Sequence, residues 1–160
     1  MKSRTEGAGV EWMEEVTILS RALVEEMYAH ARRESPAECL GLVGGRGAVA
    51  QTIYPARNVA PDPLVRCEAD YEDLLRGQKL RRERDERLLG IYHSHPLDAD
   101  PVPSETDVRV AYYPEVIYFI IGFDGAGRGV LRAFRIFKEA GRWFEEDGRW
   151  ERAEFRVTEE

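Results

Sequence analysis

The stretch LLGIYHSHP, residues 88–96, combines an apolar strand with polar, chemically active side chains at its end. Residues 88–92 are apolar apart from one glycine and predict a strand that gives rigid support to a site at its end. His93 and His95 follow two positions apart, so in an extended strand both imidazoles point to one face, with Cα atoms roughly 6 to 7 Å apart. The pair predicts two metal ligands at the rim of a sheet.

A third ligand is predicted downstream, where SETD, residues 104–107, follows the proline-rich loop 96–103. The pattern S-x-x-D is typical of a helix N-terminus, with Ser104 as the cap and Asp107 in the first turn. The positive end of the helix dipole favours ionised Asp107, which is the form that binds a metal. Two histidines and a carboxylate leave one vertex of a zinc tetrahedron for water, as in catalytic sites. We therefore expect Zn²⁺ as the cofactor.

Glu38 is the candidate general base for that water. It lies in SPAECLGLVGG, residues 35–45, where a predicted helix gives way to an apolar run. Each feature has a simpler explanation when taken alone: the histidine pair as satisfied or surface side chains, Ser104 with Asp107 as a plain capping box, and Glu38 as an acid in a surface loop. His30 is most simply a helix-surface residue. The combination of residues is what indicates a catalytic metal.

Two helices are predicted beside this strand. Over residues 20–35 the apolar side chains recur at helical spacing, and the pattern ends at Pro36. Residues 71–87 read as a charged helix anchored by Leu74, Leu75 and Leu80, after a loop over 59–70.

The other apolar segments predict strands. The run 39–45 and the partly alternating segment 49–58 predict a hairpin, and the unbroken apolar run 115–123 predicts a central strand buried on both faces. Further strands are expected over 127–137, and amphipathic edge strands over 143–157. This order predicts a mixed α/β fold whose central sheet is mixed, largely antiparallel and flanked by helices.

Composition sets the remaining expectations. A chain of 160 residues with 43% hydrophobic residues predicts a single domain, here residues 16–160 after a loosely ordered tail over 1–15. The net charge of −7 disfavours nucleic acid and anionic membranes as partners, and no apolar run approaches the ~20 residues of a membrane span. Two cysteines, Cys39 and Cys67, favour reduced thiols in the cytoplasm, although one disulfide stays possible.

These residues resemble a known family. An upstream glutamate, H-S-H-P, a short loop and S-x-x-D closely resemble the JAMM, or MPN-plus, metallopeptidases, which cleave peptide or isopeptide bonds next to ubiquitin and ubiquitin-like proteins. PAECLGLVGG, LLGIYHSHP and EVIYFIIGF fall in the order that the family shows, over roughly residues 18–136. The resemblance implies an MPN/JAB-like fold.

The resemblance also implies a role for each motif residue. His93, His95 and Asp107 would bind zinc, Glu38 would deprotonate the zinc-bound water and pass the proton to the leaving amine, and Ser104 would donate a hydrogen bond to the tetrahedral oxyanion. One departure stands out: eight residues separate His95 from Ser104, where the family usually has seven. We expect the proline-rich loop to absorb the extra residue. Two aspartates within it, at positions 98 and 100, are rival carboxylates for the metal.

The chain has little room for accessory insertions and resembles the stand-alone prokaryotic members of the family. Those members trim small β-grasp proteins of the sulfur-carrier type at a C-terminal Gly-Gly tail, and such a tail could lie along residues 57–70. A non-catalytic scaffold is the main alternative, opposed by the complete motif. A DNA-repair-associated branch with a related motif is disfavoured by the acidic charge and by the lack of an attached DNA-binding module.

Overall fold

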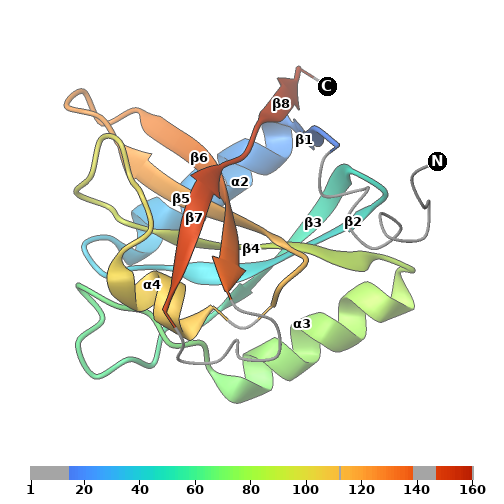
Figure 1. Cartoon of the computed structure of the whole chain (residues 1–160), viewed down its shortest axis with the longest axis horizontal. Helices are drawn as coiled ribbons and strands as arrows, with labels where there is room; N and C mark the ends of the chain where they lie inside the picture. The colour runs from blue at the N-terminus through green and yellow to red at the C-terminus, as the bar shows by residue number, and fades with distance from the viewer. Residues whose placement is uncertain (1–14, 112, 139–146, 160) are drawn as a thin grey trace.

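The computed structural model describes residues 15–111, 113–138 and 147–159. Most of the predicted tail therefore lies outside the described residues. The elements, in chain order, are β1 (Thr17–Ser20), α2 (Arg21–Glu34), β2 (Leu40–Arg46), β3 (Val49–Ala56), α3 (Tyr71–Glu83), β4 (Arg87–Ser94), α4 (Glu105–Val110), β5 (Ile117–Phe123), β6 (Gly129–Lys138), β7 (Gly148–Arg152) and β8 (Phe155–Thr158) (Figure 1).

The described strands form one eight-stranded sheet in the order β7-β6-β5-β4-β2-β3-β1-β8. The pairs β2/β3, β2/β4, β5/β6 and β6/β7 are antiparallel, whereas β4/β5, β1/β3 and β1/β8 are parallel. The sheet is therefore mixed and largely antiparallel, as predicted. The predicted hairpin is β2/β3, and the predicted central strand β5 lies between β4 and β6.

The sheet is curled. β7 and β8 stand at opposite ends of the strand order, yet only residues 153 and 154 connect them. Such a link spans at most about 11 Å, so the two edges of the sheet must come close together. In Figure 1 the chain leaves β7 and continues directly to β8, which lies beside β1. The expectation of C-terminal edge strands is confirmed for β7 and β8.

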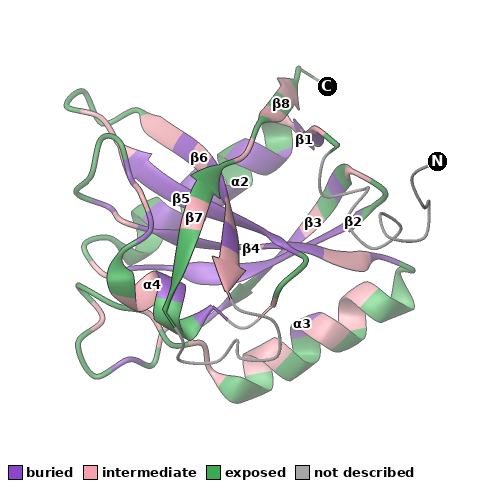
Figure 2. Cartoon of the chain, viewed as in Figure 1, coloured by how far each residue is buried: buried purple, intermediate pink, exposed green. Residues whose placement is uncertain are grey.

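Helix α2 covers one face of the sheet. Its N-cap is Ser20, whose Oγ accepts a hydrogen bond from the Leu23 N–H at 3.1 Å, and it ends before Pro36. Its buried stripe, which includes Met27, packs against side chains such as Val43 and Phe119 in the main core. Burying one such side chain stabilises the fold by about 1.5–3 kcal/mol. The buried strands form the centre of Figure 2.

Helices α3 and α4 stand on the opposite face. Leu42, Ile91 and Tyr118 are lateral neighbours on β2, β4 and β5 and face this side. Helix α3 approaches closely at Gly77, where a Cβ would lie 3.2 Å from side-chain atoms of Leu42. Val108 of α4 joins a second apolar cluster together with Tyr118. The ends of β2 and β4 therefore lie between two helices.

Four details differ from the sequence predictions. Helix α3 ends at Glu83, four residues before the predicted end of this helix at residue 87, which instead begins β4. His30 is 5% exposed, and its Nδ1 lies 2.8 Å from the Tyr92 hydroxyl, so it is a core residue and not a surface one. Leu75 is 52% exposed and does not anchor α3, because the side of the helix that faces the sheet is the one carrying buried Gly77. The short strand β1, which adds β8 to the sheet, was not predicted.

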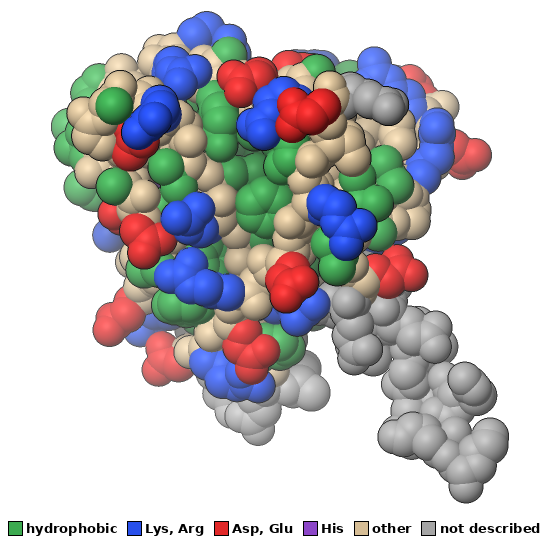
Figure 3. Space-filling view, turned by 90° about the horizontal axis from the view of Figure 1, so that it is seen from above, with side chains coloured by type: hydrophobic (Ala, Val, Ile, Leu, Met, Phe, Trp, Pro, Cys, Tyr) green, Lys and Arg blue, Asp and Glu red, His purple; other side chains and the backbone are tan. Residues whose placement is uncertain are grey.

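The surface carries charges of both signs. On the face shown in Figure 3, basic and acidic side chains are interspersed and do not form a patch of one sign. No helix in the described ranges is long and apolar enough to cross a membrane.

Candidate metal centre

His93 lies on β4, and its side chain is on the face of the sheet that α3 and α4 cover. His93 is 8% exposed and is flanked laterally by Leu40 on β2 and Ile120 on β5. The His95 N–H donates to the Ile121 carbonyl at 2.8 Å, so the chain stays held against β5 one residue beyond the end of β4. The two imidazoles therefore meet, as the i, i+2 spacing predicts.

Ser94, between the histidines, ties β4 to the start of β2. Its side chain is fully buried, and its Oγ accepts a hydrogen bond from the Cys39 N–H at 2.8 Å. The Ser94 N–H in turn donates to the Cys39 carbonyl at 3.0 Å. This reciprocal pair fixes Glu38, the preceding residue, beside His93.

Three ligand atoms converge on one point. The Nε2 atoms of His93 and His95 are 3.1 Å apart, and they lie 3.2 and 3.1 Å from Oδ2 of Asp107. The edges of a tetrahedron around zinc with bonds of 2.0–2.1 Å are about 3.3 Å long. The triangle therefore has the size of one face of such a tetrahedron.

The charge of the site also suits a cation. Burial alone would raise the pKa of Asp107, but His93, His95 and the Ser104 N–H hold it well below its usual range. Burial alone would lower the pKa of His93, yet the Asp107 carboxylate outweighs burial and raises it. The anionic carboxylate therefore favours positive charge at the point where the imidazoles meet.

Helix α4 orients Asp107 through a capping box. The Asp107 N–H donates to Ser104 Oγ at 3.0 Å, and the Ser104 N–H donates to Asp107 Oδ2 at 2.9 Å. The oxygen that faces the histidines is thus held by the backbone as well. The predicted cap and first-turn positions of Ser104 and Asp107 are confirmed, despite the longer loop before them.

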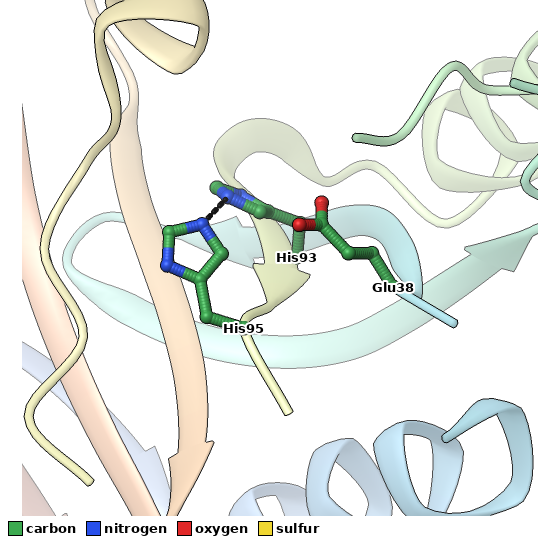
Figure 4. Close-up of side chains that lie close together, drawn as sticks. All are labelled: Glu38, His93 and His95. Atoms are coloured by element: carbon green, nitrogen blue, oxygen red, sulfur yellow. Dashed lines mark hydrogen bonds between the residues drawn. The ribbon is translucent and has the colours of Figure 1, made fainter. Parts of the chain in front are cut away.

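Glu38, which comes just before β2, lies close to the two histidines. One ligand atom each from Glu38, His93 and His95 lies within 4.8 Å of the other two, and Figure 4 shows the Glu38 carboxylate directed toward His93. Glu38 is 6% exposed, and its Oε1 has no hydrogen-bond partner within the described part of the chain. Burial raises the pKa of this carboxyl. An unpaired buried carboxylate oxygen is costly unless a metal, water or substrate meets it.

The loop 57–70 is fastened beside Glu38 by Asn58. Its Nδ2 donates to the Glu38 carbonyl at 2.9 Å, and its Oδ1 accepts from the N–H groups of Ala60 and Glu68 at 3.0 and 3.1 Å. The Glu38 N–H donates to the Pro63 carbonyl at 2.8 Å. The loop is thereby closed on itself and fixed to the base of the site.

A cavity of about 530 Å³ opens beside the metal centre. His93 and Asp107 form part of its wall, the loop residues 66–69 border it, and its floor is made of aliphatic side chains of the sheet such as Leu42 and Ile136. An apolar or extended segment of a substrate therefore has room next to the ligand atoms.

The rival carboxylates lie elsewhere. Asp98 and Asp100 are both exposed, and the Asp100 carboxylate pairs with Arg132 at 3.1 Å. The loop around them is held by backbone contacts, because the Phe123 N–H donates to the Asp98 carbonyl at 3.0 Å. Asp107 is therefore the carboxylate that meets the histidines.

Sequence reasoning missed three supporting residues: Ser94, Asn58 and Cys67. Ser94 and Asn58 act through backbone partners 55 and 20 positions away, which no local pattern reveals. Cys67 lies at the cavity wall, where its thiol interacts with Glu38. Both cysteines are free thiols, as favoured from the sequence.

The donor set fits a divalent metal. The triangle of Nε2, Nε2 and Oδ2 matches a tetrahedral face, and a carboxylate oxygen of Glu38 lies within 4.8 Å of a nitrogen of each histidine. His93, His95 and Asp107 would hold the ion.

Comparisons with known proteins show the family to which the chain belongs. The family model "Prokaryotic homologs of the JAB domain" matches residues 20–137. A relative from Thermus thermophilus, named "Probable TtuB-protein conjugate cleaving protease", is 42% identical over 110 residues, 69% of this chain and 72% of that protein. A "Desampylase" from Haloferax volcanii is 35% identical over 108 residues, 63% of this chain and 76% of that protein. A "CysO-cysteine peptidase" from Mycobacterium tuberculosis is 32% identical over 123 residues, 76% of this chain and 83% of that protein.

Solved structures share the fold. A protein from Desulfitobacterium hafniense superposes with a TM-score of 0.74 at 32% identity, covering 91% of this chain and 94% of that chain. A JAB1/MPN domain protein from Archaeoglobus fulgidus has a TM-score of 0.53 at 18% identity, covering 90% and 100%, and supports the fold alone. With a family model that matches most of its length, this chain belongs to the prokaryotic homologues of the JAB domain.

Proposed function

We propose that the protein is a zinc-dependent metallopeptidase that hydrolyses a peptide or isopeptide bond at the C-terminal tail of a ubiquitin-like or sulfur-carrier protein. The observation that carries the proposal is the convergence of His93, His95 and Asp107 beside the buried, unpartnered Oε1 of Glu38. The names of the three relatives support the substrate class, because each refers to cleavage of a protein conjugate or a peptide. The two free cysteines of this chain, Cys39 and Cys67, fit a cytoplasmic location.

The residues divide the chemistry between them. His93, His95 and Asp107 would hold the metal. When bound, zinc lowers the pKa of a coordinated water to about 7 and polarises the scissile carbonyl. Glu38 accepts a proton from the attacking water, and the low-dielectric surroundings that raise its pKa suit it to pass that proton on to the leaving amine.

Ser104 is placed to act on the oxyanion. Its Oγ accepts the capping hydrogen bond from Asp107, which uses a lone pair and leaves the O–H proton to donate. The side chain is exposed at the edge of the site, within reach of solvent and substrate. We propose that this hydroxyl donates to the oxygen of the tetrahedral intermediate.

The surface around the site supports a protein substrate. Apart from Val49, the large hydrophobic side chains that are exposed in the described residues lie on segments bordering the centre. They are Val59, Leu64 and Val65 in the loop 57–70, Tyr71 and Leu75 on α3, Leu97 in the loop after His95, and Val110 on α4. Val110 also lines the cavity, where an apolar part of a protein substrate could pack.

The test is to offer the purified protein linear fusions and isopeptide conjugates of several ubiquitin-like and sulfur-carrier proteins, with and without a chelator. We expect cleavage after the C-terminal tail of the carrier, lost on chelation and restored by zinc. A non-catalytic scaffold would bind a carrier protein without cleaving any conjugate at stoichiometric zinc, and that result would refute the proposal.

A further inference from the structure

Cys67 lies where the metal centre opens into the cavity. It belongs to the cavity wall together with His93 and Asp107, it is half-buried, and its thiol interacts with the Glu38 carboxylate. The chain's other cysteine, Cys39, is 1% exposed in the core. A thiol is therefore available at this one place, against the residue that serves as the base in the proposed function.

The surroundings of Cys67 suit a cation. The carboxylates of Glu38 and Asp107 both act on the thiol electrostatically. The same negative potential attracts a divalent cation, and a thiophilic metal ion removes the thiol proton outright on binding.

Glu38 supplies a second ligand for such a cation. Its Oε1 is buried without a hydrogen-bond partner among the described residues, and the side chain is 6% exposed. Zinc accepts both thiolate sulfur and carboxylate oxygen.

We propose that Glu38 and Cys67 form a second, inhibitory site for a thiophilic divalent cation such as Zn²⁺, next to the centre held by His93, His95 and Asp107. The proposal rests on the proposed function for its effect on activity. On binding, a metal–sulfur bond replaces the S–H bond, the proton leaves to solvent, and no electrons are transferred. The ion occupies the carboxylate that would otherwise accept the proton of water, so excess zinc stops turnover.

The test is a metal titration of the metal-free protein. With Co²⁺, whose bond to a thiolate gives an ultraviolet charge-transfer band, we expect no such band during the first equivalent and its growth with the second. With Zn²⁺, peptidase activity should rise to one equivalent and then fall by about 100-fold as the second site fills, because a general base contributes roughly 10²–10⁴-fold.

Two variants make the result decisive, each compared with its own activity at one equivalent. Cys67→Ser should lose both the cobalt band and the inhibition, whereas Cys39→Ala should keep both. A thiolate band during the first equivalent, or equal inhibition of Cys67→Ser by excess zinc, would overturn the second site. A protein that hydrolyses nothing at one equivalent would instead count against the proposed function, while the cobalt titration still reports on Cys67.

Discussion

At the scale of single residues, Glu38 is the proposed general base and not a proposed metal ligand. It lies beside the histidines but outside the triangle that they form with Asp107. Glu38→Gln should keep stoichiometric zinc and lose turnover by ~10² to 10⁴-fold, because the amide cannot accept the proton of water. Zinc content and single-turnover rates measure the two effects. Glu34→Gln, an exposed acid four residues earlier, is the matched control, and loss of zinc from Glu38→Gln would mean that Glu38 is a ligand.

Asp107 should be the carboxylate that holds the ion. Asp107→Asn keeps an oxygen for the Ser104 N–H but removes the negative charge, so zinc affinity should fall by more than about 100-fold, since weaker outer-shell changes already cost 10–100-fold. Competition with a chelating dye measures the affinity. The matched variant Asp100→Asn, which alters the exposed partner of Arg132, should bind zinc normally. The reverse pattern would place the rival carboxylate at the metal.

His30 makes stability depend on pH. Burial lowers its pKa below the ordinary value of about 6.5, and its Nδ1 lies 2.8 Å from the Tyr92 hydroxyl. Because the folded-state pKa is depressed, this contribution to stability is complete above about pH 6.5 and is lost as the pH falls through the folded-state pKa. Urea unfolding of the metal-free protein from pH 7.5 to pH 5 should show the decline. His30→Gln, which stays neutral, should show a smaller decline, and an equal one would contradict the assignment.

At the scale of elements, the loop between His95 and Ser104 depends on a close backbone contact with β5. A Cβ at Gly122 would lie 2.1 Å from the Asp98 carbonyl oxygen. Gly122→Ala should therefore destabilise the protein by about 1–3 kcal/mol and weaken zinc binding, because the displaced loop leads into α4 and Asp107. Chemical denaturation and zinc titration measure both.

The matched control for that change is Gly125→Ala, where an added Cβ meets nothing within 4 Å. It should leave zinc binding unchanged. If Gly122→Ala binds zinc as tightly as Gly125→Ala does, the loop does not set the position of Asp107.

Most elements could be predicted from sequence because their signals are local. The periodicity of α2, the apolar run of β5 and the S-x-x-D cap of α4 can each be read from one short, continuous segment of the sequence. His30 was misassigned although the periodicity contained its position, since it lies three residues after Met27 on the buried stripe. Its polar ring suggested the surface, and its partner Tyr92 is 62 residues away.

At the scale of the whole molecule, the strand order and the packing of distant segments could not be predicted from local sequence patterns. The pairing of β8 with β1 joins the first and last strands of the described residues and curls the sheet, and no short-range signal specifies that register. The same long-range packing places β2, β4 and α4 together, so that ligands predicted from spacing actually meet. The spacing of residues was enough to predict His93, His95 and Asp107 as ligands. The contacts of Ser94 and Asn58, which hold Glu38 in place, could be identified only from the folded structure.

The measurement that tests the metal centre most directly is zinc K-edge X-ray absorption of the protein loaded with one equivalent. The arrangement predicts a four-coordinate ion with nitrogen and oxygen ligands at about 2.0–2.2 Å, two of them imidazoles, and one position taken by solvent. A sulfur ligand near 2.3 Å in this first site, or a shell filled entirely by protein donors, would contradict it.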